Sequence, residues 1–134
     1  MNTSPTTDDL LAGLRKVCAA LPEVTEGLTH GAPTWFVLGR RSFAKFVDPE
    51  GRRLDEPHVG FWAAAPPGAL QELTAADPGR FYVPRFGGRD WVGMRLDVEP
   101  DGPDWDEVRE IVGDAYRMVA PKSLVARLGS APGR

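Results

Sequence analysis

Cysteine, histidine and long apolar runs are scarce in this chain of 134 residues. The single cysteine, Cys18, cannot form a disulfide within the chain, and its place on the apolar stripe of an expected helix predicts a buried thiol. No apolar run approaches the ~20 residues that a membrane span requires. The first residues, MNTSPTTDD, lack the basic and apolar stretches of a secretory signal. We therefore expect a cytoplasmic protein without membrane contact.

Signatures of catalysis and of metal binding are also missing. The two histidines, His30 and His58, are far apart and belong to no ligand-spaced pair. The chain contains no GxSxG, GxxxxGK[ST] or GxGxxG motif. We therefore expect no enzyme activity, no cofactor and no metal site. A small-ligand cleft beside His30 and Trp35 is the weakest alternative, because no convergent polar groups mark it in the sequence.

One acidic segment resembles the start of a calcium loop, with Asp97, Glu99 and Asp101 at alternate positions. The resemblance fails further along, because the position of the bidentate glutamate is Val108 and Pro103 stands where a carbonyl ligand is needed. We interpret these acids as solvated residues before a helix.

Positive charge is in deficit overall, with a net charge of −3 and a pI near 5.4. This excludes a protein that coats nucleic acid through bulk positive charge. The distribution is uneven: residues 1–39 carry two basic and four acidic side chains, residues 40–95 nine and seven, and residues 96–134 five and eight. The middle of the chain is therefore mildly basic.

The stretch FYVPRFGGRDWVGMRLD, residues 81–97, predicts a β-hairpin around Gly87-Gly88, since both central residues of a two-residue turn need positive φ. Counting from this turn pairs Arg85 with Asp90, Tyr82 with Gly93 and Phe81 with Met94. Alternation then predicts a core face and an opposite face. The core face holds Phe81, Val83, Val92, Met94 and Leu96; the opposite face holds Tyr82, Pro84, Phe86, Arg89, Trp91 and Arg95.

Periodicity and turn residues predict the other elements. A helix is expected from Thr6 or Thr7 to Leu21, a second after Gly68, and a long third one after Asp104, whose spacing from Glu107 suits a capping box. Strands are expected near 24–32, at 34–38, at 42–47 and at 58–63. A second hairpin turns at Gly39-Arg40, or at these two residues together with Arg41, and the sequence leaves its register open. Helical turns follow Pro121 up to Leu128, and residues 1–5 and 129–134 are expected to be frayed tails of a single domain over 1–134. This order predicts an α+β two-layer sandwich, with an antiparallel sheet packed on one side by the N- and C-terminal helices.

Cations and aromatic residues on the two hairpins form the one candidate site. Its predicted members are Arg40, Arg41, Lys45, Arg85, Arg89, Trp91 and Arg95. The arginines and the lysine could contact phosphates, while Trp91 or Phe86 touches sugars or bases. A purely structural explanation competes with this one: Trp91 stacks on Pro84, and Tyr82 shields Gly93.

Four segments in order, LPEVTEGLTHGAPTWFV, RRSFAKFV, DWVGMRLD and DWDEVREIVGDAYRMVAPKSLVARL, resemble the MmcQ/YjbR family over nearly the whole chain. The resemblance implies a fold similar to CyaY, the frataxin-like protein, and to type III secretion chaperones. It also implies binding of double-stranded DNA through a double wing, whose wings would be the hairpins at Gly39-Arg40 and Gly87-Gly88. The alternative is a protein-interaction module that receives a partner on the sheet face with Tyr82, Phe86 and Trp91.

Overall fold

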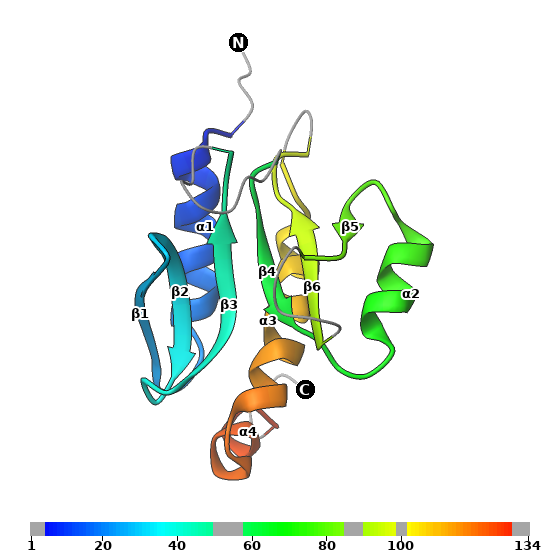
Figure 1. Ribbon diagram of the computed structural model, residues 1–134. Helices are drawn as coiled ribbons and strands as arrows, with labels where there is room; N and C mark the ends of the chain where they lie inside the picture. Colours follow the sequence, from blue (N-terminus) through cyan, green and yellow to red (C-terminus); the bar gives the residue numbers. More distant parts are fainter. Residues whose placement is uncertain (1–4, 50–57, 85–89, 99–101, 130–134) are drawn as a thin grey trace.

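A computed structural model of the chain describes residues 5–49, 58–84, 90–98 and 102–129 (Figure 1). One antiparallel sheet of six strands, in the order β1-β2-β3-β4-β6-β5, carries helices on one face. The α+β class and the packing of terminal helices on one side of the sheet are thus confirmed. The elements are α1 (Thr7–Ala19), β1 (Val24–Thr29), β2 (Ala32–Val37), β3 (Arg41–Val47), β4 (Gly60–Ala64), α2 (Ala69–Ala76), β5 (Phe81–Tyr82), β6 (Trp91–Arg95), α3 (Trp105–Val119) and α4 (Lys122–Gly129).

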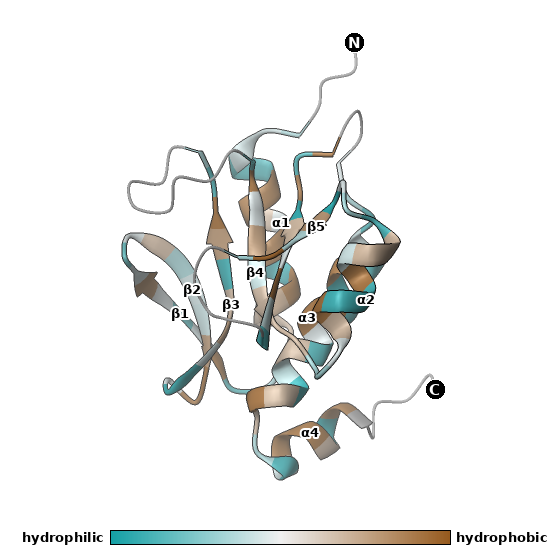
Figure 2. Cartoon of the chain, turned by 45° about the vertical axis from the view of Figure 1, so that its right-hand side comes forward, coloured by the Kyte–Doolittle hydropathy of each residue, from teal (hydrophilic) through white to brown (hydrophobic). Residues whose placement is uncertain are grey.

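The main core lies between the sheet and the pair α1 and α3, which run behind it in Figure 1. Apolar residues of the sheet and of these helices form one buried cluster. Figure 2 shows the hydropathy of each residue along these elements. β4 is one of the two central strands, and all of its residues are buried. Helix α2 lies outside this layer, beside the short strand β5 at the edge of the sheet (Figures 1 and 2).

Helix α1 begins as its sequence predicts. The Thr6 side chain accepts a hydrogen bond from the Asp9 backbone at 3.0 Å, and the Asp9 carboxylate accepts one from the Thr6 backbone at 3.0 Å. This capping box satisfies two backbone donors that the first helical turn leaves free. Cys18 is fully buried on the inner side of the helix, and burial raises the pKa of its thiol. The prediction of a buried core thiol is confirmed.

Helix α3 begins at a residue that the sequence marks, but only half of the predicted cap forms. The Asp104 carboxylate accepts a hydrogen bond from the Asp106 backbone at 3.0 Å. The Glu107 side chain instead accepts from Arg80, which also binds Asp77. These two carboxylates raise the pKa of the Arg80 guanidinium, Glu107 contributing more. Glu107 therefore ties the start of α3 to the segment between α2 and β5.

The register of the β5–β6 pair is confirmed where the structure describes it. Phe81 pairs with Met94 and Tyr82 with Gly93, as counting from Gly87-Gly88 predicts. Val83, which the same count assigns to the core, is 64% exposed, so this prediction is wrong. Strand β5 ends at Tyr82 because Pro84 has no N–H for the ladder and restricts the residue before it. The turn itself, with Arg85, Phe86 and Arg89, lies outside the described residues.

The β2–β3 connection differs from the predicted turn. Strand β2 ends at Val37, and the loop Leu38–Arg40 follows, closed by a hydrogen bond from the Arg40 backbone to the Val37 carbonyl at 3.0 Å. Leu38 and Gly39, rather than Gly39 and Arg40, have positive φ. A β-bulge interrupts the pairing between Trp35/Phe36 and β3. An inserted residue of this kind shifts which side chains face the core, so counting alternate residues from the turn does not give the register.

The predicted C-terminal tail begins one residue too early, since α4 extends to Gly129. Residues 130–134 and 1–4 lie outside the description. Within the described part of the chain, none of the helices combines the length and apolar character that crossing a membrane demands.

Candidate nucleic-acid interface

Arg40 and Arg41 are the two predicted site residues that the structure places together in solvent. Both are exposed, one in the last loop position before β3 and the other as its first residue. The loop that carries them is held by the Leu38 backbone, which donates a hydrogen bond to the Glu23 carbonyl at 2.9 Å. Two adjacent guanidinium groups on a backbone-bonded turn suit contact with an anionic partner.

Lys45 and Trp91 lie elsewhere, on the sheet face opposite α1 and α3. Lys45 is half-buried, with its Nζ 5.8 Å from the centre of the Trp62 ring, and burial lowers the pKa of its amine. Trp91 is also half-buried and packs, with Tyr82, on the small apolar cluster around Trp62.

Tyr82 has the structural role that the competing explanation gives it. Its ring covers Gly93, so that a Cβ atom on Gly93 would approach it to under 3.0 Å. Its hydroxyl accepts a hydrogen bond from the indole nitrogen of Trp62 at 3.2 Å. Because this face is packed, its aromatic residues are largely sheet-stabilising.

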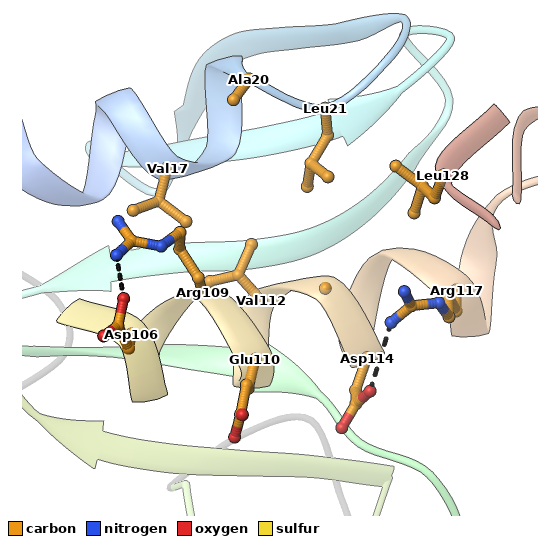
Figure 3. Close-up of a pocket in the computed structure, with 11 residues that line it drawn as sticks. Val17, Ala20, Leu21, Asp106, Arg109, Glu110, Val112, Asp114, Arg117 and Leu128 are labelled. Atoms are coloured by element: carbon orange, nitrogen blue, oxygen red, sulfur yellow. Dashed lines mark hydrogen bonds and ion pairs between the residues drawn. The ribbon is translucent and has the colours of Figure 1, made fainter. Parts of the chain in front are cut away.

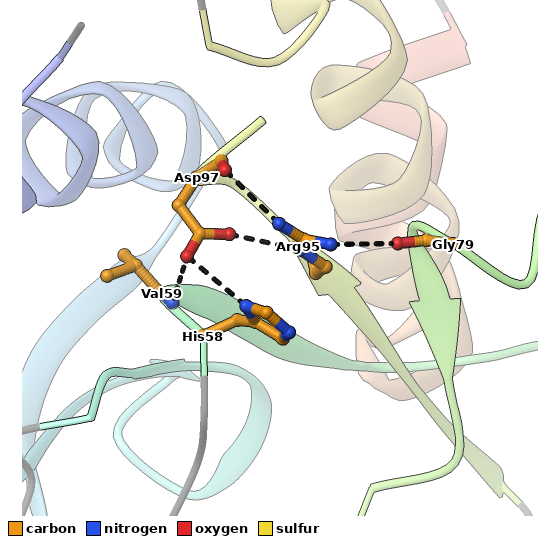
Figure 4. Close-up of polar contacts among 5 residues, drawn as sticks. All are labelled: His58, Val59, Gly79, Arg95 and Asp97. Carbon is orange, nitrogen blue, oxygen red and sulfur yellow. Dashed lines mark hydrogen bonds and ion pairs between the residues drawn. The ribbon is translucent and has the colours of Figure 1, made fainter. Parts of the chain in front are cut away.

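Arg95 is held by a local polar cluster (Figure 4). Its guanidinium donates to the Asp97 carboxylate at 3.1 Å and to the Gly79 carbonyl at 3.3 Å. The other oxygen of Asp97 accepts from the Val59 backbone at 3.1 Å and lies 3.5 Å from the His58 ring. This arrangement neutralises the charge of Arg95, so Arg95 does not extend the exposed cations.

Arg85 and Arg89 lie outside the described residues, but the ends of their connection are defined. The antiparallel register sets the end of β5 and the start of β6 at the same end of the sheet as Arg41. The β2–β3 loop, the end of β5 and the start of β6 therefore lie at the same end of the sheet.

The last two helices bring further cations to this end. The Tyr116 hydroxyl donates to the Pro22 carbonyl at 2.6 Å, and its ring meets the Phe43 ring edge-on at 5.7 Å. Arg127 of α4 lies 3.9 Å from the Glu23 carboxylate. The backbone carbonyl of Glu23 accepts a hydrogen bond from Leu38 in the β2–β3 loop. Helix α4 and the loop thus share one end of the molecule, at the bottom of Figure 1.

We call this surface the basic end. Its five members are Arg40, Arg41, Arg117, Lys122 and Arg127, all exposed. Arg117 lies 3.5 Å from Asp114 and Arg127 lies near Glu23, so two of the five have carboxylate neighbours.

Sequence reasoning missed the last three members. A signal existed: after Asp114 the chain contains four basic residues, Arg134 included, and no acidic one. Averaging the charge over residues 96–134 concealed this, because all eight acids of that segment precede Ala115.

Four acidic residues lie at the opposite end, where α1 and α3 begin, whereas Glu23, Asp90 and Asp114 lie toward the basic end. Asp8 and Asp9 lie in the first turn of α1, and Asp106 and Glu107 lie in the first turn of α3. A Cβ atom on Gly102, just before α3, would come within 4.0 Å of Leu10, which places the two helix starts side by side. The net charge of −3 therefore describes a polarised molecule rather than a uniformly acidic one.

A groove of about 810 Å³ lies among the helices, between α1, α3 and α4 (Figure 3). Its apolar lining includes Val17, Leu21 and Leu128. The rim is charged: Arg109 binds Asp106, Arg117 lies near Asp114, and Glu110 has no partner among the described side chains. An adjoining hollow of about 480 Å³ continues it toward Trp105 and Lys16.

His30 and Trp35, the two residues beside which a small-ligand cleft was the weakest alternative, do not form a ligand site together. His30 occupies the exposed β1–β2 turn, whereas Trp35 is 1% exposed in the core. Among the described residues, no group of three or more potential metal ligands occurs.

Comparison with known proteins adds a family and a fold. A family model named YjbR matches residues 19–118. The crystal structure of the Deinococcus radiodurans protein DR2400, which carries a DUF419 domain, is similar with a TM-score of 0.68 and 19% identity, and the match covers 96% of each chain. No curated protein matches the sequence.

Proposed function

This chain belongs to the YjbR family, and from that premise we propose that it is a non-enzymatic DNA-binding protein whose basic end contacts the phosphates of a duplex. The observation that supports this most is the separation of charge. Five exposed cations share one end, while the first turns of α1 and α3, at the other end, are acidic. Such a molecule approaches a polyanion with its basic end first, whatever its net charge.

The ion pairs at the basic end do not prevent this role. Arg117 and Arg127 are more than half exposed, and their carboxylate neighbours lie at 3.5 and 3.9 Å. Exposed pairs of this kind contribute little, about 0–1 kcal/mol, so a phosphate can replace the carboxylate. Arg40 and Arg41 form no ion pair with another described residue, and they carry the first contact.

The spacing of the hairpins also suits a duplex. β3 and β6 are separated by β4 alone, which sets them ~10 Å apart. The major groove of B-DNA is about 12 Å wide. The β2–β3 loop and the start of β6 therefore have a spacing that suits phosphates on either side of this groove.

We expect the double variant Arg40→Glu/Arg41→Glu to lose duplex binding. For the unmodified chain, the slope of log K against log salt should be about −3 to −5, at ~0.9 per neutralised phosphate with up to five contacts. The double variant should bind at least ~10-fold more weakly at about 50 mM salt, with a slope shallower by about 2. Fluorescence anisotropy with a labelled duplex of ~20 base pairs, long enough for all these phosphates, measures both.

The matched control is Lys16→Glu/Arg109→Glu, which makes the same change in net charge beside the groove. It should keep most of the affinity. Equal loss in both variants would mean that net charge alone governs binding. The proposal is wrong if the unmodified chain binds no duplex at about 50 mM salt, a condition that favours electrostatic contacts.

A protein-interaction role is the second proposal, and the groove between α1, α3 and α4 supports it. An apolar floor with a charged rim suits an amphipathic helix. Since Glu110 is unpaired among the described residues, we expect the groove to bind a basic helix, such as a model peptide of Leu and Lys.

Two lysine variants test this groove. Ala20→Lys, at the groove, should weaken peptide binding in a calorimetric titration, while Ala19→Lys, one residue away and outside the lining, should not. Equal binding by both variants would exclude the groove.

A further inference from the structure

Strand β1 forms an outer edge of the sheet, and no described element lies beyond it (Figures 1 and 2). The opposite edge is protected, because β5 has only two residues and α2 packs beside it. β1 has six residues, paired with β2 without interruption. The sheet therefore has one short, covered edge and one long, open edge.

The register shows which backbone groups of β1 are available. Thr29 pairs with Ala32 across the two-residue turn, so the N–H and C=O groups of Thr29, Gly27 and Thr25 point toward β2. The hydrogen bond from the Leu38 backbone to Glu23 continues the same alternation. The backbone groups of Val24, Glu26 and Leu28 therefore point outward.

This edge lacks the features that usually prevent strand pairing, such as lysine, proline or a bulge. Leu28 is 73% exposed. The one charged side chain, Glu26, accepts two hydrogen bonds of 2.8 Å from Arg15, which lower the pKa of its carboxyl group. The edge is thus apolar in part and electrically neutral.

We propose that β1 pairs antiparallel with β1 of a second copy of this chain, about a two-fold axis at Gly27. The sequence of the strand is self-complementary in this register. Thr25 stands opposite the partner's Thr29, a favourable cross-strand pair, and Gly27 stands opposite the partner's Gly27. Glu26 stands opposite the partner's Leu28, and both direct their backbone groups outward, which forms a hydrogen-bonded pair.

The sequence of β1 selects a second copy over another strand, because the threonines lie symmetrically around Gly27. The neighbouring register, with Glu26 opposite the partner's Glu26, sets two carboxylates face to face and is disfavoured. The contact buries less than the ~1,200 Å² of a standard interface, so the dimer is weak, with a Kd of ~10–100 μM.

A cysteine at the axis tests the register. Gly27 opposite the partner's Gly27 is a non-hydrogen-bonded pair with Cα atoms about 4.5 Å apart, which a disulfide spans. A Cβ atom at Gly27 makes only an ordinary contact of 3.5 Å with Phe36, and Cys18 is buried and does not compete. Oxidised Gly27→Cys should run as a dimer on a non-reducing gel.

Thr25→Cys and Thr29→Cys are the matched controls. Each should stay monomeric alone, because the two copies of either residue lie about 13 Å apart in this register, at ~3.3 Å per residue. A mixture of the two should form a cross-linked heterodimer. Cross-linking of Thr25→Cys with itself, or of Gly27→Cys to a different polypeptide in place of its own copy, would overturn the proposal.

Sedimentation of the unmodified chain gives a test without cysteines. The average mass should rise toward that of a dimer near ~100 μM, and Leu28→Lys, a change at an exposed position, should shift this rise at least ~10-fold upward. A mass equal to that of one chain up to ~500 μM would overturn the proposal, since no strand pairing of the expected strength would then occur.

Discussion

Gly60→Ala should destabilise the protein by about 3 kcal/mol, which corresponds to a fall in Tm of about 10 °C. A Cβ atom on Gly60 would lie under 3.0 Å from the carbonyl oxygen of Met94. Next to Gly60, the Val59 carbonyl also accepts hydrogen bonds from two successive backbone nitrogens, those of Leu96 at 2.8 Å and Asp97 at 3.2 Å. Because the obstacle is backbone in the centre of the sheet, no side-chain rotation can relieve it. Thermal and urea unfolding measure the change.

The same substitution at Gly113 is the control, and its sign should be opposite. Gly113 lies inside α3, and its Cβ atom would lie 3.4 Å from the flexible end of Arg117. Alanine in a helix interior is favoured over glycine by about 0.5–1 kcal/mol. A loss of less than ~1 kcal/mol in Gly60→Ala would contradict the tight contact of β4 with β6, since overpacking of a core ordinarily costs more.

Tyr116→Ala should cost about 3–5 kcal/mol, as removal of a fully buried aromatic ring does. The ring packs on Phe43 near the start of β3, and the hydroxyl donates to the Pro22 carbonyl before β1. The variant should therefore also weaken duplex binding, because Tyr116 holds the end of α3, which leads into α4, against Pro22 and Phe43. Chemical unfolding and anisotropy on the same sample would show both effects.

Tyr116→Phe separates the hydrogen bond from the packing. It keeps the ring against Phe43 and should cost only about 1 kcal/mol. Duplex binding should stay close to that of the unmodified chain. If Tyr116→Phe were as damaging as Tyr116→Ala, the hydrogen bond to Pro22, rather than the packing, would hold the basic end together.

Local sequence signals predicted much of the fold because they act over a few residues. Thr6 with Asp9 marked the start of α1, and Asp104 marked the start of α3. Counting from Gly87-Gly88 predicted the register in which β5 pairs with β6. The predictions failed where a distant residue intervened. Arg80 took Glu107 from the expected capping box, for example.

The candidate site was predicted less completely than the fold. Arg40 and Arg41 were identified and are exposed, whereas Arg95 is neutralised by Asp97, and Lys45 is half-buried beside Trp62. Arg85 and Arg89 lie outside the described residues and stay predictions. A list of cations in a sequence does not show which carboxylates will lie beside them.

The sequence by itself determined the antiparallel α+β sandwich, because helix caps, turn glycines and apolar periodicity are local properties of the chain. Only the tertiary structure decided where charge gathers. The contacts of Glu23 with Leu38 and Arg127 bring a hairpin loop and a helix nearly ninety residues later to the same end of the molecule. Electrostatic attraction depends on distance in space rather than along the chain, so the basic end exists only in the folded protein.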